Sequence, residues 1–245
     1  SNNIGWSWWP VKKSRTNNIF KVTTPESYYQ LLQAWESGES LSAEQTYHAV
    51  MEYSKAHRHE NTTVAPDVIY ALINNEDPTA TKAYRHHGVD QWIPFVDYDL
   101  GRDGYAYEDR LSQNIHDEQG QWKVWNEGRK YRNDGVDIGG SAGGYFVSWT
   151  EPGEWLQYTI QVPQAGEFKL ELETKGAASR LRMEINDEIK NDEIAIKTGS
   201  ENSPGEWATT TVNGIELSTG ELKIRFHIQE GAPDLRAFRL VSGLE

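Results

Sequence analysis

The sequence of 245 residues contains no cysteine, which excludes disulfide bridges and thiol chemistry. It has no apolar run long enough for a membrane-spanning helix and shows no signal peptide. Positive charge is scarce, with 24 lysines and arginines against 37 acidic residues and a formal net charge of -13. Because this charge repels phosphates, we expect neither nucleic acid nor an anionic membrane as a partner. Neutral polymers, sugars and divalent cations remain open.

Aromatic side chains, in contrast, are abundant. Ten tryptophans and twelve tyrosines occur in a chain whose mean hydropathy is -0.74. Flat aromatic faces serve either in a hydrophobic core or against sugar rings. The chain starts with SNNIGWSWWPVKK and without methionine, so we expect it to be a fragment of a longer protein.

Residues 1–85 are predicted to be rich in α-helix. The residues that signal helix starts and stops are Thr24-Pro25, Gly38, Ser42 with Gln45, and Pro66-Asp67. The expected buried faces are Tyr28, Leu31, Leu32 and Trp35; then Tyr47, Val50, Met51 and Ser54; then Val68, Ile69, Leu72 and Ile73. NIGWSWW (residues 3–9) predicts one strand. A lone strand has no sheet to join, so this part is expected to need a partner outside the sequence.

From about Ile93 the hydrophobic period changes to two, which is typical of β-strands. The expected inward-facing residues are Leu156, Tyr158, Ile160 and Val162; Phe168, Leu170 and Leu172; Leu181, Met183 and Ile185; and Leu222, Ile224, Phe226 and Ile228. The turn signals PQAG (163–166), NSPG (202–205) and STG (218–220) separate these runs. The pattern predicts an antiparallel β-sandwich over residues 92–245, with a domain boundary near residues 85–92.

Five motifs in a fixed order carry a resemblance to a known family. They are VDYDLGRDGYAY (96–107), YRNDGVDI (131–138), VSWTEPGEWLQYTIQVPQAGEF (147–168), GEWATTTVNGIELSTGELKIRF (205–226) and APDLRAFRLV (232–241). Residues 92–242 thereby resemble a family 6 carbohydrate-binding module. The resemblance implies a mainly β chain with a jelly-roll β-sandwich, and a polysaccharide such as β-glucan or xylan as its partner.

The N-terminal part is similar to a second family. GWSWWPVKK (5–13) and TPESYYQLLQAW (24–35) resemble the eighth strand and eighth helix of a family 5 glycoside hydrolase, a (β/α)8 barrel. The resemblance implies that residues 1–85 are the C-terminal remnant of such a barrel and that its catalytic carboxylates lie upstream. It also implies a secreted, extracellular or cell-surface protein, bacterial in origin. Trp9 matches the tryptophan that floors the cleavage subsite of these enzymes; here we expect it to be a packing residue.

The family 6 resemblance implies a sugar ring held between two loop aromatic residues, which fall on Trp149 and Trp207. The third contact falls on Asp234, where the family usually has asparagine; an ionised carboxylate can only accept hydrogen bonds. The alternative is that Trp149 is an ordinary core residue, although it directly precedes the turn TEPGE. Trp155 opens a strand, so we expect it to be structural or part of the sandwich face.

Asp97 and Asp99 are predicted to alternate on the first sandwich strand, which would place both carboxylates on one face. The resemblance implies that two acidic residues there bind a structural Ca²⁺, for which carboxylate oxygens are suitable ligands. The alternative is a pair of solvated acids at a sheet edge. Asp134 and Asp137 are weaker candidates for the remaining ligands.

Other motifs carry less. His57 and His59 in HRHE, and His86-His87, lack the spacing of a metal site, and Asn61-Thr62-Thr63 matches the glycosylation triplet by its residues alone. GGSAGG (139–144) is expected to be a flexible loop. The alternative to a binding module is a β-glycoside hydrolase, for which two flanking carboxylates are needed. Glu151 and Glu154 are the acids near the aromatic pair.

Overall fold

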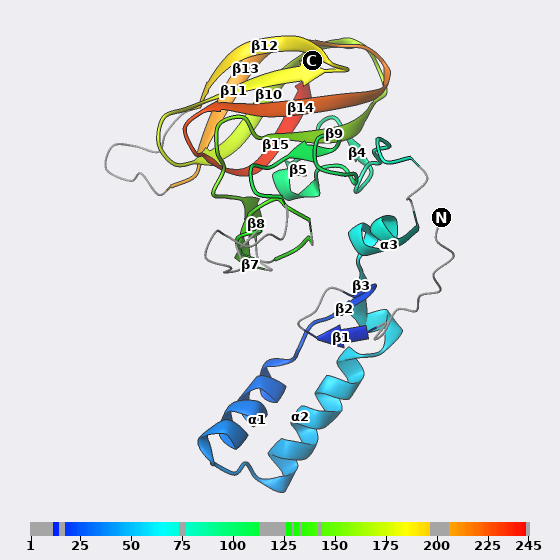
Figure 1. Cartoon of the computed structure of the whole chain (residues 1–245), viewed down its shortest axis with the longest axis vertical. Coiled ribbons are helices and arrows are strands. Elements are labelled where there is room, and N and C mark those ends of the chain that lie inside the picture. Colours follow the sequence, from blue (N-terminus) through cyan, green and yellow to red (C-terminus); the bar gives the residue numbers. More distant parts are fainter. Residues whose placement is uncertain are drawn as a thin grey trace, which may run out of the picture. The chain divides into compact units, whose positions relative to one another are not determined.

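The computed structural model describes residues 12–14, 18–73, 77–112, 126–128, 130–132, 134–141, 144–196 and 206–243. The chain divides into two compact units, residues 1–73 and 74–245 (Figure 1). No helix in the described ranges is both long and apolar enough to cross a membrane. The strand predicted at residues 3–9, Trp9 and the turn NSPG lie outside the described residues.

Within its described residues, the first unit contains three helices and a small sheet. The elements are β1 (Lys12–Ser14), β2 (Phe20–Val22), α1 (Glu26–Ser37), α2 (Ala43–Ala56), the 3-10 helix η1 (His59–Asn61), β3 (Thr62–Val64) and α3 (Pro66–Ile73). The sheet has the order β1-β2-β3, with a parallel and then an antiparallel pair. The prediction of one strand in this part is therefore wrong. The three strands were missed because strands of three residues are too short to show an alternating pattern.

The helix signals are largely confirmed. Ser42 Oγ accepts a hydrogen bond from Gln45 N at 3.2 Å, and Ser42 N donates to Gln45 Oε1 at 3.0 Å, which completes the predicted capping box of α2. Gly38 ends α1 with a φ of 75°, a conformation that glycine adopts without strain. The cap of α1 is Pro25 and not Thr24, and no side chain caps this helix.

The predicted buried faces of these helices hold only in part. Leu31 is fully buried, and Tyr28 of α1 stacks on Tyr53 of α2 with ring centroids 3.9 Å apart. Ala49 is the buried residue of α2. The large apolar residues that remain exposed in these two helices are Trp35 (58%), Tyr47 (68%), Val50 (40%) and Met51 (37%). Helix α2 therefore keeps an uncovered apolar stripe, and α1 exposes one large apolar residue, Trp35.

The second unit is a sandwich of two sheets, antiparallel throughout except that β4 pairs with β9 in parallel. Its elements are β4 (His87–Gly88), β5 (Ile93–Pro94), the 3-10 helix η2 (Phe95–Asp97), β6 (Tyr107–Glu108), β7 (Ile138–Ser141), β8 (Gly144–Val147), β9 (Trp155–Val162), β10 (Gly166–Lys175), β11 (Ser179–Ile185), β12 (Glu188–Ile196), β13 (Ala208–Leu217), β14 (Gly220–Glu230) and β15 (Asp234–Ser242). One sheet has the order β13-β10-β15-β8-β7, with β5 also pairing with β15. The other has the order β12-β11-β14-β9-β4, with β6 also pairing with β9 (Figure 1).

The core between the two sheets confirms the predicted alternation. Leu156, Tyr158, Ile160 and Val162 of β9 are all buried, and so are the inward-facing residues expected in β10, β11 and β14. Four aromatic rings, those of Phe95, Tyr158, Phe226 and Phe238, meet edge to face or tilted at its centre. Because both sheets contribute to one contiguous cluster, the sandwich buries a complete core of its own.

The sandwich begins earlier in the chain than the predicted boundary near residues 85–92. Lys82 and Leu100 exchange two backbone hydrogen bonds of 2.7 and 2.9 Å, and β4 pairs with β9. Gln157 Nε2 donates to Thr81 Oγ1 at 3.1 Å. Residues from Thr81 onward are thus tied into the second unit, because their polar groups find partners there.

Candidate functional site

The register of one sheet brings several predicted site residues to one end of the sandwich. Lys175, the last residue of β10, lies opposite Asp234, the first residue of β15. One position inward, Thr174 of β10 pairs with Ala208 of β13 on one side and with Leu235 of β15 on the other. Leu235 also pairs with Val147 of β8. The residues at the ends of these four strands form the strand-end row: Trp207, Lys175, Asp234 and Ser148.

Asp234 is held by two neighbours in this row. Its Oδ2 forms an ion pair with Lys175 Nζ at 2.9 Å, and its Oδ1 accepts a hydrogen bond from Ser148 Oγ at 2.5 Å. The carboxylate therefore acts as an acceptor only, as expected for an ionised aspartate. Its charge is balanced by the lysine, so the row has no strong preference for a charged ligand.

Trp207 lies at the other end of the row and is half-buried. Its ring meets Phe146 edge to face, with centroids 5.2 Å apart and an interplanar angle of 74°. Lys175 Nζ lies 5.0 Å from the ring centroid, and Arg236 Cζ lies 5.5 Å from it. These cation–π contacts fix the orientation of the indole and leave part of it accessible.

Trp149 follows Ser148 and has 52% of its surface exposed. Its backbone has a φ of 54°, a left-handed conformation that is uncommon for a residue with a bulky side chain. Both neighbours are fixed: Ser148 N donates to Asp137 O at 3.0 Å, and Thr150 Oγ1 donates to Pro233 O at 2.8 Å. The exposed indole is thus presented by an anchored turn. It is not a core residue, and that alternative is excluded.

The structure brings Trp149 and Trp207 to the same end of one sheet without joining them. No ring contact links the two in the part of the chain that the structure describes. Sequence reasoning missed Lys175, Ser148 and Phe146, which support the pair. Lys175 ends the alternating run KLELETK, but only the register of β10 with β15 reveals that it faces Asp234.

Trp155 has a different position, on the outer face of the second sheet. It opens β9 opposite His227 of β14, with ring centroids 6.0 Å apart. Arg225 Cζ lies 4.6 Å from the indole centroid. The ring therefore belongs to the sandwich face, one of the two structural roles expected from its place at the start of a strand.

Asp97 does not lie on a strand, contrary to the sequence pattern, because residues 95–97 form the 3-10 helix η2. Its buried carboxylate accepts a hydrogen bond from Tyr131 Oη at 2.5 Å. Arg85 Nε and His87 Nε2 lie 3.4 and 3.8 Å from its Oδ2. Burial lowers the pKa of His87, and the negative charge of Asp97 acts in the opposite direction.

Asp99 is 1% exposed and has a separate set of partners. Its Oδ1 accepts a hydrogen bond from Thr159 N at 2.8 Å, and its Oδ2 accepts from Thr159 Oγ1 at 2.7 Å and from Gln157 Nε2 at 2.9 Å. Calcium needs several free oxygen ligands. Protein donors already occupy both carboxylates, so the donor set around Asp97 and Asp99 does not fit a shared ion.

The other candidate ligands are also engaged. Arg132 Nη2 donates to Asp134 at 2.8 Å, and the hydroxyl of Tyr98 donates to the same carboxylate. Asp137 accepts a hydrogen bond from the backbone of Glu127. Among the described residues, no group of three or more histidines and acidic residues is placed to hold a metal ion.

Three carboxyl groups under the Trp149 turn have strongly raised pKa values. Burial raises the pKa of Asp109 to about 8, that of Glu154 to about 7 and that of Asp137 to about 6. Repulsion among neighbouring carboxylates adds to each shift, while backbone hydrogen bonds to all three groups oppose it. Glu154 accepts two of these bonds, from Arg110 N at 3.2 Å and from Glu151 N at 2.8 Å.

Raised carboxyl pKa values can mark a catalytic site, but the geometry here does not favour one. The hollow beside Asp109, Asp137 and Glu154 has about 10 Å³ for a water-sized molecule. That is roughly the space of one water and far below that of a sugar. Glu154 also holds its own turn through Glu151 N. The catalytic alternative at Glu151 and Glu154 is therefore not favoured.

Comparison with known proteins places these observations in a family context. Residues 132–240 match the model of the family described as carbohydrate binding module (family 35). The sandwich has a carbohydrate-binding module fold. The matched range contains Trp149, Trp207 and Asp234, and the residues between them that form the strand-end row.

Several solved structures are similar to the module. One is a family 6 module from Clostridium stercorarium in complex with cellobiose (12% identity, TM-score 0.42, covering 65% of this chain and 98% of the other). Another is a β-1,3-glucan-binding family 6 module from Bacillus halodurans (10% identity, TM-score 0.41, covering 64% of this chain and 100% of the other). A third is the C-terminal family 6 module of a laminarinase from Zobellia galactanivorans (15% identity, TM-score 0.41, covering 62% of this chain and 98% of the other). No curated protein sequence matches the chain.

Proposed function

We propose that the module binds a neutral polysaccharide at the strand-end row, with one sugar ring stacked between Trp149 and Trp207. The observation that carries the proposal is the exposed indole of Trp149 on a left-handed backbone. Such a conformation costs about 1–3 kcal/mol and is concentrated at ligand sites. The anchored neighbours Ser148 and Thr150 supply the contacts that hold it.

The spacing of the strands supports this geometry. Trp207 precedes β13 and Trp149 follows β8, and three strand-to-strand steps separate β13 from β8 in the sheet. With neighbouring strands about 4.8 Å apart, the two backbones are separated by roughly 14 Å. A sugar ring in contact with both indoles needs about 3.5–4.0 Å on each face, and the two side chains can span the remainder.

The chemistry of the row suits a pyranose. Axial C–H groups stack on aromatic faces, while the ring hydroxyls need directed donors and acceptors. Asp234 can accept, Lys175 can donate, and Ser148 can do both. Because Lys175 and Asp234 neutralise each other, a neutral sugar matches this row better than an ionised one.

The polymer class is part of the same proposal. Similar modules are named for cellobiose, cellotriose and β-1,3-glucan as their ligands. We therefore propose a β-glucan, a xylan or a related polymer as the partner of this chain. Calcium binding by Asp97 and Asp99 stays a prediction that rests on the resemblance alone, and the protein donors that occupy both carboxylates argue against it.

We further propose that the module works beside a catalytic domain of the family 5 glycoside hydrolase type in one secreted, extracellular or cell-surface bacterial protein. The resemblance of residues 1–85 to the end of such a barrel motivates this proposal. The exposed apolar stripe at Tyr47, Val50 and Met51 supports it, because such a stripe is stabilised when a partner covers it.

The test is affinity electrophoresis in gels that contain xylan, β-1,3-glucan, β-1,4-glucan or agarose. We expect at least one polymer to retard the chain, and we expect no reducing sugar to be released from it. The control is the double variant Trp149→Ala/Trp207→Ala, which should migrate as in a polymer-free gel. Equal migration of the parent chain in all gels would refute the proposal, and steady sugar release would restore the catalytic alternative.

A further inference from the structure

A second hollow lies on the outer face of the module, away from the hollow beside Asp109, Asp137 and Glu154. It has a volume of about 470 Å³, within the range of small-molecule sites. It opens where β15 has two short partners along one edge: Leu235 faces Val147 of β8, and Ala237 faces Pro94 of β5. Since Ala237 and Gly144 are small, no side chain from these positions fills the space between the two strands.

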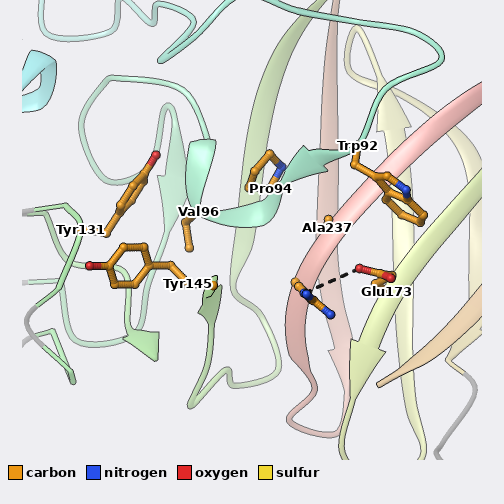
Figure 2. A pocket seen from close by; sticks show the side chains of 9 residues that line it. Trp92, Pro94, Val96, Tyr131, Tyr145, Glu173 and Ala237 are labelled. Atoms are coloured by element: carbon orange, nitrogen blue, oxygen red, sulfur yellow. Dashed lines mark ion pairs between the residues drawn. The ribbon is translucent and has the colours of Figure 1, made fainter. Parts of the chain in front are cut away.

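Aromatic rings stand at both ends of this hollow. Trp92, which is 38% exposed, lies at one end, and Tyr131 and Tyr145 lie together at the other (Figure 2). Arg239 Cζ lies 4.5 Å from the Trp92 centroid, and the two tyrosine centroids are 5.0 Å apart. The rings are therefore held in place without a ligand.

The floor and the polar groups complete the lining. Pro94, Val96 and Ala237 supply the apolar part of the lining (Figure 2). Arg236 Nε and Glu173 Oε2 form an ion pair with a distance of 3.8 Å. Because this ion pair is neutral overall, the hollow does not attract a charged ligand strongly. A carboxylate and a guanidinium between aromatic walls suit a molecule with both hydroxyls and apolar C–H faces, which is the chemistry of a neutral sugar.

The hollow adjoins the strand-end row through Arg236. This side chain lines the hollow and also lies over the ring of Trp207. Glu173 and Lys175 are two residues apart on β10, so their side chains share one face of the sheet. Lys175 in turn contacts both Trp207 and Asp234. A continuous polar strip thus runs from the row to the hollow.

We propose that this hollow is an extended subsite for the same saccharide chain, whose neighbouring residue occupies the strand-end row. The inference rests on the proposed polysaccharide binding. It adds that the module prefers oligosaccharides long enough to reach Trp92 and Tyr145. A disaccharide fills the row alone, and a hexasaccharide fills both places.

The experiment compares calorimetric titrations of the full chain with di- and hexasaccharides of the cello-, laminari- and xylo- series. We expect the best hexasaccharide to bind at least about tenfold more tightly than its disaccharide. Trp92→Ala should remove that advantage and leave the disaccharide affinity unchanged. Trp35→Ala, which alters an exposed tryptophan of the first unit, should change neither.

A filling variant tests the same point without removing a contact. A Cβ added at Gly144 meets nothing within 4 Å, so Gly144→Leu can place a side chain beside the hollow. Gly166→Leu is the matched control, since a Cβ there also meets nothing and β10 begins at that residue, far along the strand from Glu173. Gly144→Leu should weaken hexasaccharide binding about tenfold, and Gly166→Leu should leave it unchanged. Melting curves confirm that each variant is folded.

The outcomes separate the inference from the function on which it rests. If Trp92→Ala and Gly144→Leu bind the hexasaccharide like the parent while Trp149→Ala does not, the extended subsite is wrong and the row is right. If the parent binds the disaccharide and the hexasaccharide with equal affinity, the extended subsite is also wrong. If the parent binds none of the oligosaccharides, both proposals are overturned.

Discussion

At the scale of single residues, the conformation of Trp149 is the main clue to what the module does. A left-handed backbone at a tryptophan is strained, and a half-exposed indole buries little apolar surface in return. Packing alone therefore gives no reason for a tryptophan at this position. Presentation of its ring to a ligand gives one.

The first prediction concerns this ring and its counterpart. Trp149→Ala and Trp207→Ala should each weaken binding by about 2 kcal/mol, close to thirtyfold, because each removes one stacking face. The two losses should not be additive, since both rings grip the same sugar. Titration with a soluble oligosaccharide measures the affinity of the two single variants and of the double variant. Trp155→Ala is the control: it should lower the melting temperature with little effect on affinity, because its ring packs against Arg225 on the sandwich face.

The buried carboxyl groups below the Trp149 turn should make the stability of the sandwich depend on pH. Asp109, Glu154 and Asp137 have folded-state pKa values of about 8, 7 and 6. Each lies above the ordinary value near 4 that holds in the unfolded chain. The folded protein therefore holds these protons more tightly than the unfolded chain does. By linkage, their favourable contribution is fully present at about pH 4 and is lost as the pH rises to about 8.

We accordingly predict that the free energy of unfolding of the sandwich falls between pH 5 and pH 9, a range set by these pKa values. Asp109→Asn should flatten this slope and raise the stability at pH 9, because it removes the proton-binding group with the largest shift. Denaturant unfolding at several pH values measures both effects. An unchanged slope in Asp109→Asn would show that another group controls it.

At the scale of elements, β9 joins the core to the segment that precedes β6. Its inward face carries the alternating apolar residues, while Gln157 and Thr159 on its outer face bind the carboxylate of Asp99. Asp99 N also donates to Gln157 O at 2.8 Å. This buried polar clamp fixes residues 95–100 against the sheet. Protein donors therefore satisfy the buried carboxylate of Asp99.

The clamp leads to a prediction about calcium. Because protein donors satisfy Asp99, the melting temperature should be the same in chelator and in excess calcium. Asp99→Ala should lower stability by about 3 kcal/mol, since it leaves buried donors unpaired, whereas Asp99→Asn keeps one acceptor oxygen and should cost less. Thermal unfolding of the three proteins with and without chelator is the measurement. A lower midpoint in chelator that calcium restores would show that the ion binds after all.

Long strands were predictable and short ones were not. The alternation of Leu156, Tyr158 and Ile160 extends over a whole strand and predicts its inward face correctly. The three-residue strands of the first unit show no period and become strands only through their neighbours. The prediction that Asp97 lies on a strand also fails. Residues 95–97 form a 3-10 helix, and an element this short leaves no periodic pattern in the sequence.

At the scale of the whole molecule, the sites depend on contacts between distant segments. The motifs around Trp149, Trp207 and Asp234 could be found in the sequence, and the register of one sheet brings them to a common end. The hollow near Trp92 could not be found in this way. It depends on β5 and β8 sharing the edge of β15, and such pairings between distant strands leave no local pattern.

The division of the chain leads to the last prediction, which concerns where the module begins. A chain of residues 74–245 should keep the binding affinity and the melting temperature of the sandwich, because the contacts of Thr81, Lys82 and β4 remain. A chain of residues 92–245 should be less stable by about 3 kcal/mol, since it loses the Lys82–Leu100 hydrogen bonds, the pairing of β4 with β9 and the bond to Thr81. Both chains keep Trp92 and the strand-end row, so any difference reflects support of the sheet and not loss of a sugar contact. Denaturant unfolding and oligosaccharide titration of the two chains are the measurements, and equal stability would place the start of the module at residue 92.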